Sequence, residues 1–309
     1  MSDFIKSFEN CVAYRAHLTR IMENLKSVCD KDETCRKRLL VFARKRGLPI
    51  EFLDEHGIFY LSKEVADAYG SKKKVRQPDT ASVPKKEERD KENLWRTQSR
   101  KVFRFIGATV STPGIGSRNI LADRIVYPLY SYITEEDKPL VCGVCGYDMS
   151  KGALAKYIYC QTPYFDRVGY LYGEEDFIYA PSQKGVFMAE GLVDKLWLEY
   201  VSKKLGYNFM TLAVCGVTTH DIKMSKLGIL GECSHIFYFP DRDKSGKEFS
   251  DTLVRKLTNR KVTLCYVRVG CKDVAEDFNS REYPEDFSEF AKLLCNTKDG
   301  KPCGVSFQV

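Results

Sequence analysis

Residues 186–204 read VFMAEGLVDKLWLEYVSKK, and this stretch decides the fold of the second half of the chain. The uninterrupted apolar run at Val186–Ala189 is typical of a buried strand, and the pattern over Leu192–Lys204 is typical of a helix. The same order continues over Met210–Cys215, His235–Phe239, Lys247–Leu257 and Val262–Val269. Alternation of strand and helix predicts a parallel sheet covered by helices.

Acidic residues follow three of the predicted strands. They are Glu190, Asp241, Asp243 and Asp273, with Asp194 one turn into the helix after Glu190. Ligands of an open α/β sheet bind beyond the carboxyl ends of its strands, so we expect these carboxylates to share one place. Clustered carboxylates repel one another unless a cation lies among them, and oxygen ligands favour hard ions such as Mg²⁺. Such a site suits phosphoryl transfer, either to join or to cleave nucleic acid.

The rest of the chain is predicted to form four further segments. Residues 1–69 have apolar residues at helical spacing, with stops at Gly47 and Gly57, so we expect a helical N-terminal region. Residues 70–100 are rich in lysine and poor in apolar residues, which predicts a flexible basic linker. We expect a mixed sheet over residues 101–180, the parallel sheet over residues 181–280, and a C-terminal helix and tail over residues 281–309.

Composition places the chain among ordinary globular proteins. Of its 309 residues 43% are hydrophobic and 29% are charged, which excludes global disorder. The formal net charge of +7 permits a polyanionic partner without demanding one. No apolar run is long enough to cross a membrane and no cleavable N-terminal signal is visible, so we expect a cytoplasmic protein without a membrane partner. We expect most of its 12 cysteines to be reduced.

Several short segments resemble one known family. AEGLVD at Ala189–Asp194, PDRDKSG at Pro240–Gly246 and CKDVAED at Cys271–Asp277 together resemble the Toprim domain shared by topoisomerases and bacterial-type primases. Upstream, the chain resembles the catalytic core of DnaG-type primases, which has an arginine before an apolar strand, a glycine-rich strand end, a Lys-Tyr pair and an LYG sequence. The matching residues here are Arg124–Leu129, Gly143–Gly146, Lys156-Tyr157 and Leu171–Gly173.

The resemblance implies an α+β and α/β architecture, with a mixed-sheet subdomain followed by a Rossmann-like Toprim domain. It implies a DNA primase that uses Mg²⁺ or Mn²⁺ to make short RNA primers from NTPs on single-stranded DNA. The implied catalytic residues are Glu190, Asp241, Asp243, Lys156 and Arg124; the implied metal ligands are Glu190, Asp194, Asp241, Asp243 and Asp273; and the nucleotide or nucleic-acid contacts are Arg124, Lys156, Tyr157 and Lys184. Glu190 is also the candidate general base.

The chain departs from the family pattern in places. Tyr147 stands where the family usually has a basic residue, and Ala275 stands where it often has an acid. No zinc ribbon precedes residue 40 and no helicase motor follows the core, so we expect no structural zinc. We expect partners such as a replicative helicase or a template-recognition protein, as in a phage or other mobile replicon. The CxxC at Cys142–Cys145 lies in an apolar strand, which predicts core packing.

Two other functions fit the same residues. A Toprim nuclease needs the same carboxylates but cleaves DNA or RNA. A non-catalytic replication subunit that binds single-stranded DNA is favoured by the departures at Tyr147 and Ala275. A topoisomerase is disfavoured, because the chain is short for the large gate of such enzymes.

Overall fold

The computed structural model describes residues 2–70, 108–112, 116–135, 138–150, 153, 155–160, 164–167, 170–178, 185–204, 210–214, 230, 235–241, 243–257, 263–266, 297–298, 301–302 and 306–308. The chain forms two compact units. Unit 1 contains Met1–Phe42, Ile50–Leu129 and Glu135–Phe165, and unit 2 contains Ala43–Pro49, Tyr130–Thr134 and Asp166–Val309. Within the described ranges, no helix is long and apolar enough to cross a membrane.

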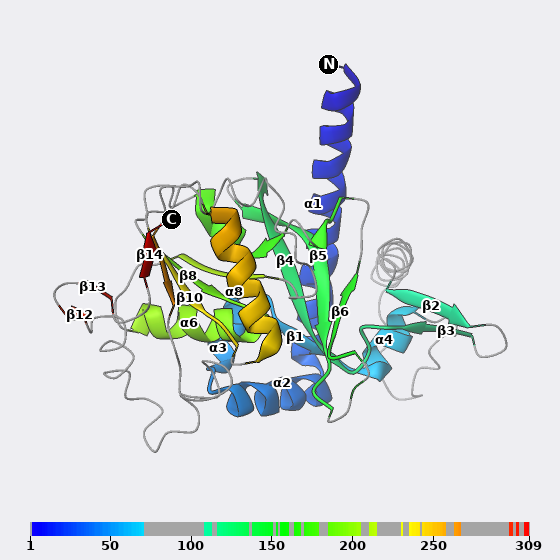
Figure 1. Ribbon diagram of the computed structural model, residues 1–309. Helices are drawn as coiled ribbons and strands as arrows, with labels where there is room; N and C mark the ends of the chain where they lie inside the picture. The colour runs from blue at the N-terminus through cyan, green and yellow to red at the C-terminus, as the bar shows by residue number, and fades with distance from the viewer. Residues whose placement is uncertain are drawn as a thin grey trace, which may run out of the picture. The chain divides into compact units, whose positions relative to one another are not determined.

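The N-terminal region is helical, as its periodicity predicted. The helices are α1 (Ser2–Lys31), α2 (Glu33–Arg46), α3 (Ile50–Glu55) and α4 (Lys63–Gly70), and they are coloured blue to cyan in Figure 1. Gly47 and Gly57 have φ values of 64° and 69°, a left-handed conformation that glycine adopts without strain, and they end α2 and α3 at the predicted places. Except for residue 70, the predicted linker lies outside the described residues.

One strand in this region was not predicted. β1 (Phe59–Leu61) follows α3, and all three of its residues are buried. It pairs antiparallel with β4 (Arg124–Glu135), so that Tyr60 lies opposite Ile125. A strand of three residues has too few positions for a periodic pattern, and its partner is distant in the sequence. Periodicity therefore cannot reveal β1.

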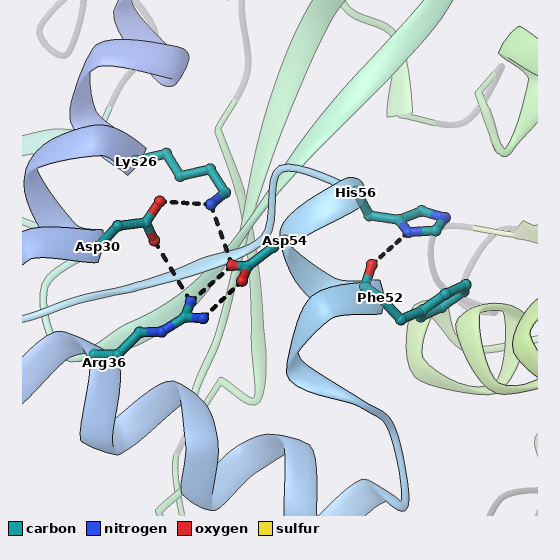
Figure 2. A network of polar contacts seen from close by, with 6 residues as sticks. All are labelled: Lys26, Asp30, Arg36, Phe52, Asp54 and His56. Atoms are coloured by element: carbon teal, nitrogen blue, oxygen red, sulfur yellow. Dashed lines mark hydrogen bonds and ion pairs between the residues drawn. The ribbon is translucent and has the colours of Figure 1, made fainter.

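An ion-pair network joins the first three helices (Figure 2). Asp54 on α3 accepts two hydrogen bonds from the guanidinium of Arg36 on α2, at 2.8 Å and 2.7 Å, and one from Lys26 on α1 at 3.2 Å. Lys26 also pairs with Asp30 at 2.7 Å. Burial would raise the pKa of Asp54, but the hydrogen bonds from Arg36 and Lys26 outweigh burial and hold that pKa below its usual range.

Replacing Asp54 by asparagine should lower the free energy of unfolding by about 1–2 kcal/mol at about pH 7, because Arg36 loses its charged bidentate partner. The pKa of Asp54 is depressed in the folded state. Its contribution to stability is therefore present above the unfolded pKa of about 3.9 and is lost as the pH falls through the folded value. In urea denaturation, the free energies of unfolding of the wild type and of Asp54→Asn should approach one another as the pH falls to about 2–3. A difference independent of pH would show that the charge of Asp54 is not the cause.

Unit 1 contains a four-stranded sheet in the order β1-β4-β5-β6, with β5 at Lys138–Tyr147 and β6 at Tyr157–Cys160. β5 and β6 pair antiparallel, and α1 packs against β5. Cys142 and Cys145 on β5 are 2% and 0% exposed, so the CxxC sequence packs in the core, as predicted. A separate hairpin of β2 (Thr109–Thr112) and β3 (Gly116–Asn119) contacts α4 through β3.

Unit 2 contains a six-stranded sheet in the order β14-β11-β10-β8-β9-β7. Its central strands are parallel, as the alternation predicted, and they are β8 (Gly185–Ala189), β9 (Met210–Val214), β10 (His235–Phe239) and β11 (Thr263–Tyr266). The edge strands β7 (Leu171–Tyr172) and β14 (Ser306–Gln308) are antiparallel to their neighbours and were not predicted. β12 (Thr297–Lys298) and β13 (Lys301–Pro302) form a hairpin. The predicted C-terminal helix falls on residues outside the described part.

Helices cover both faces of the unit 2 sheet. Phe249 and Leu253 of α8 (Lys244–Leu257) belong to one core cluster with Met188 and Tyr238 of the strands, and Figure 1 shows α8 lying across β8 and β10. α6 (Leu192–Lys204) packs against β8 and β9, and none of its described residues belongs to that cluster. α6 therefore covers the opposite face, because successive strand residues point to alternate faces.

Candidate active site

Glu190 and Asp241 are brought together by two adjacent parallel strands. β8 and β10 pair in a register that sets Ala189 opposite Phe239, so the residues just beyond the two strand ends are neighbours. Glu190 is 6% exposed. Its Oε1 accepts a hydrogen bond from the Tyr238 hydroxyl at 2.8 Å and another from the Asp241 N–H at 3.0 Å. The Glu190 carboxylate is therefore held in one orientation against the turn that follows β10.

Asp243 caps the helix that follows this turn. Its Oδ1 accepts a hydrogen bond from the Gly246 N–H at 3.0 Å, and its carbonyl accepts one from the Lys247 N–H at 3.2 Å, which is the geometry of a helix N-cap. Gly246 has no room for a side chain. A Cβ there would collide with the Asp241 carbonyl oxygen and would lie 2.6 Å from Glu190 Oε1. A glycine at this position thus lets α8 begin directly beside Glu190.

Glu190, Asp241 and Asp243 place acidic groups close to one another at this edge. Burial raises the pKa of Glu190 to about 7, and the charges of Asp241 and Asp243 add to this effect against the hydrogen bond from Tyr238. A cation would relieve the repulsion, and carboxylate oxygens are ligands that Mg²⁺ and Mn²⁺ prefer. The donor chemistry therefore fits a hard divalent ion. In the ranges that the structure describes, no group of three or more His, Cys, Asp or Glu side chains is arranged to hold a metal ion.

Asp194 lies in the first turn of α6, close to the end of the strand before Glu190. A Cβ on Gly191 would lie 2.6 Å from Asp194 Oδ2, which places the Asp194 carboxylate over the turn between β8 and α6. The structure thus brings Asp194 to the same turn as Glu190. The predicted ligand Asp273 and the predicted contact Lys184 lie outside the described residues.

Arg124 and Lys156 are neighbours in unit 1. The Arg124 guanidinium donates to the backbone carbonyl that precedes Lys156 at 3.1 Å and pairs with Asp148 at 3.2 Å. The Lys156 side chain is exposed, and its ammonium lies 5.9 Å from the centre of the Tyr147 ring. Tyr147 is 4% exposed and packs on Tyr157, with ring centres 5.0 Å apart. Tyr147, which departs from the family pattern, is thus a core residue that supports Lys156.

A buried lysine that was not among the predicted site residues lies in the first turn of α6. Lys195 is 1% exposed, its Nζ pairs with Glu199 at 2.5 Å, and the Nζ lies 5.0 Å from the centre of the Tyr172 ring. Burial would lower the pKa of Lys195, but Glu199 and Glu175 outweigh burial and raise it. Tyr172 belongs to the LYG sequence, so that motif packs against a buried charge here. The available signal was the i,i+4 spacing of Lys195 and Glu199 in an otherwise apolar stretch.

Glu175 is the least satisfied acid around Lys195. It lies in the 3-10 helix η2 (Glu174–Ile178), and its Oε2 is buried without a hydrogen-bond partner among the described residues. Burial raises the pKa of Glu175 to about 8, although the charge of Lys195 acts in the opposite direction. The folded protein therefore holds a proton on Glu175 at neutral pH.

Replacing Glu175 by glutamine should raise the free energy of unfolding by roughly 1–3 kcal/mol at about pH 8.5 and leave it nearly unchanged at about pH 5. The folded pKa lies above the unfolded value of about 4.3, so the folded state binds more protons between these two values. The stability of the wild-type protein must then fall as the pH rises through this window, and the glutamine variant lacks that fall. Urea denaturation over this pH range measures the effect. An equal gain in the free energy of unfolding at about pH 5 and at about pH 8.5 would show that ionisation of Glu175 is not involved.

No protein-family model matches the sequence, and no curated protein matches it significantly. Solved structures do match. The Aquifex aeolicus primase, with its zinc-binding and RNA polymerase domains, aligns with a TM-score of 0.60 and 15% identity over 92% of this chain. The catalytic domain of a DnaG primase bound to single-stranded DNA aligns with a TM-score of 0.61 and 16% identity over 93%.

The E. coli primase catalytic core aligns with a TM-score of 0.58 and 16% identity over 92% of the chain. The chain spans 65% of the Aquifex protein and 87% of each of the other two. The alignments with the two catalytic cores thus cover most of this chain and most of each core, whereas about a third of the Aquifex protein lies outside its alignment. The chain has the mixed α and β fold of the catalytic core of DnaG-type primases.

Proposed function

We propose that the protein is a DNA-dependent RNA polymerase of the primase type, which makes short RNA primers on single-stranded DNA by metal-dependent nucleotidyl transfer. The observation that carries the proposal is the hydrogen bond from the Asp241 N–H to the Glu190 carboxylate, at the carboxyl edge of the parallel sheet, in a chain with a primase-core fold. Ligands of α/β sheets bind at that edge, and acidic side chains there suit nucleotidyl transfer assisted by divalent ions.

The side chains at this edge have three proposed roles: metal ligand, general base and support of that base. The residues that would hold Mg²⁺ or Mn²⁺ are Glu190, Asp194, Asp241, Asp243 and Asp273. When bound, the ion supplies positive charge for the triphosphate of the incoming nucleotide and for the primer 3′-hydroxyl. Glu190 is also the candidate general base for the proton of that hydroxyl. Tyr238 keeps that carboxylate aligned through its hydrogen bond.

We assign phosphate binding first to two residues of unit 1, Lys156 and Arg124. The exposed ammonium of Lys156 is accessible to a nucleotide or template phosphate. The guanidinium of Arg124, which pairs with Asp148, fixes the backbone before Lys156 and is itself a proposed phosphate contact. Tyr157 offers a partly exposed ring for base stacking, and Lys184 is a further proposed contact.

The proposed substrates are single-stranded DNA and NTPs, and the proposed partners are a replicative helicase or a separate template-recognition protein. Single-stranded DNA as the template is supported by the similarity to a primase catalytic domain that was solved with single-stranded DNA. We further propose that the protein acts in the replication of a phage or other mobile replicon.

A product assay tests the proposal. The purified protein is incubated with single-stranded DNA, labelled NTPs and Mg²⁺ or Mn²⁺, and the products are separated by size. The expected product is short RNA whose formation depends on both DNA and NTPs. Shortened DNA or RNA formed without NTPs would identify a nuclease instead. DNA binding with neither product would identify a non-catalytic subunit.

A further inference from the structure

Helix α2 carries a dense set of basic residues that the proposed active site does not use. Its sequence, ETCRKRLLVFARKR, contains six basic residues and one acidic residue among 14. Two of the basic residues are set apart by their surroundings: Arg36 is held by Asp54, and Arg46 lies partly buried. The other four, Lys37, Arg38, Arg44 and Lys45, are all exposed.

These four residues share one side of the helix. At about 100° of rotation per residue, Lys37, Arg38, Arg44 and Lys45 fall within an arc of about 120°. Val41 falls inside the same arc and is 55% exposed, and it is the only exposed large hydrophobic residue in the described part of the chain. The buried residues Cys35, Leu39, Phe42 and Ala43 lie on the opposite side. We call the side formed by Lys37, Arg38, Val41, Arg44 and Lys45 the α2 basic face.

The only acidic residue of α2, Glu33, contacts this face through one exposed ion pair. Glu33 pairs with Lys37 at 2.6 Å, and the two side chains are 82% and 73% exposed. An ion pair so exposed contributes little and is easily exchanged for another anion. No acidic residue lies between Lys37 and Lys45 in the sequence. The positive charge of the face is therefore available to a partner.

We propose that the α2 basic face binds the phosphate backbone of nucleic acid. The four cations lie along about 12 Å of helix, which matches a linear polyanion better than a single small anion. One exposed valine supplies too little apolar area for a protein partner, since protein interfaces have an apolar core rimmed by polar residues. Contacts from lysine and arginine to phosphates hold the chain without reading its sequence. The proposal depends on the proposed function only in taking the polyanion to be the template.

Removing the four charges tests the proposal. Fluorescence anisotropy with a labelled single-stranded oligonucleotide, measured without divalent metal or NTPs, compares the wild type with the Lys37→Gln, Arg38→Gln, Arg44→Gln, Lys45→Gln variant. At about 50 mM salt, we expect the variant to bind at least roughly tenfold more weakly. The slope of log K against log salt should become shallower by about 0.7 for each phosphate that is no longer neutralised, or about 2–3 in all. The same titration with a labelled duplex of equal length shows whether the face binds single-stranded or duplex DNA more tightly.

A matched control removes the same charge elsewhere. Lys203, Lys204, Arg255 and Lys256 are exposed and lie in the last turns of α6 and α8, at the helix ends away from the candidate site, and all four are changed to glutamine. We expect this variant to keep most of the affinity and slope. A second control, Lys37→Arg with Lys45→Arg, keeps the charges and should keep the affinity.

Two results would overturn the proposal: unchanged affinity and slope in the α2 variant, or an equal loss of affinity in the α6 and α8 control. The first result would mean that the α2 basic face does not contact the oligonucleotide, and the second would mean that net charge alone attracts it. The assay needs no catalysis, so its outcome is independent of primer synthesis. Weaker DNA binding by the α2 variant of a protein that makes no RNA would refute the proposed function and leave this inference standing.

Discussion

Glu190→Gln and Asp241→Asn should each lower the initial rate of RNA synthesis by about 10³-fold or more, because each removes a negative charge that the proposed cation needs. Glutamine and asparagine keep the size of the original side chains. The Tyr238 hydroxyl can still donate to an amide oxygen at position 190, so the local fold should persist. The initial rate on single-stranded DNA under saturating NTPs measures the effect.

The matched control for this prediction is Asp251→Asn. Asp251 is an exposed acid on α8, the helix that Asp243 caps, and its charge has no role in the proposed site. Its rate should stay within about twofold of the wild type, as expected for an exposed surface change. Activity that survives in Asp241→Asn together with Asp243→Asn would show that the carboxylates at the sheet edge are not the catalytic site.

Lys195→Met should lower the free energy of unfolding by about 3–5 kcal/mol, because it leaves the charge of Glu199 without its buried cation. Methionine has a volume close to that of lysine, so packing against the Tyr172 ring is largely kept and the change in stability reports the charge. Urea denaturation at about pH 7 measures the change. Lys203→Met is the control, since Lys203 pairs with the same Glu199 at 2.7 Å but is 58% exposed.

The control Lys203→Met should lower the free energy of unfolding by less than about 1 kcal/mol. Adding Glu199→Gln and Glu175→Gln to Lys195→Met should recover most of the stability, because the triple variant buries no unpaired charge. A destabilisation by Lys195→Met as small as that by Lys203→Met would contradict a buried charge network. A triple variant less stable than Lys195→Met would show that the two glutamates stabilise the fold without the lysine.

The parallel core of unit 2 was readable from the sequence because its strands are buried on both faces. β10 and α6 have the predicted bounds, and β8 differs from its prediction by one residue. The edge strands β7 and β14 have two and three residues and pair antiparallel with β9 and β11. Strands this short show no alternation, and their pairing depends on segments distant in the sequence. Sequence periodicity therefore could not predict β7 and β14.

The candidate site was readable in part. The motif positions of Glu190 and Asp241 identified two acidic residues that a hydrogen bond joins, from the Asp241 N–H to the Glu190 carboxylate. The sequence did not reveal the contact from Tyr238, although a tyrosine inside an apolar strand usually needs a partner for its hydroxyl. Asp243 has a second role as a helix cap. The partner of Arg124 was also missed, because Asp148 lies beyond the next strand and no local pattern links the two.

Calorimetric titration with Mn²⁺ tests most directly the central claim that the carboxylates at this edge hold a divalent cation. The wild type should bind Mn²⁺ and release protons. Binding should be tighter at about pH 8 than at about pH 6, because Glu190, with a pKa of about 7, must lose its proton to bind. Asp241→Asn should bind at least about tenfold more weakly, while Asp251→Asn should match the wild type. Equal Mn²⁺ affinity in the wild type and in Asp241→Asn would contradict the claim.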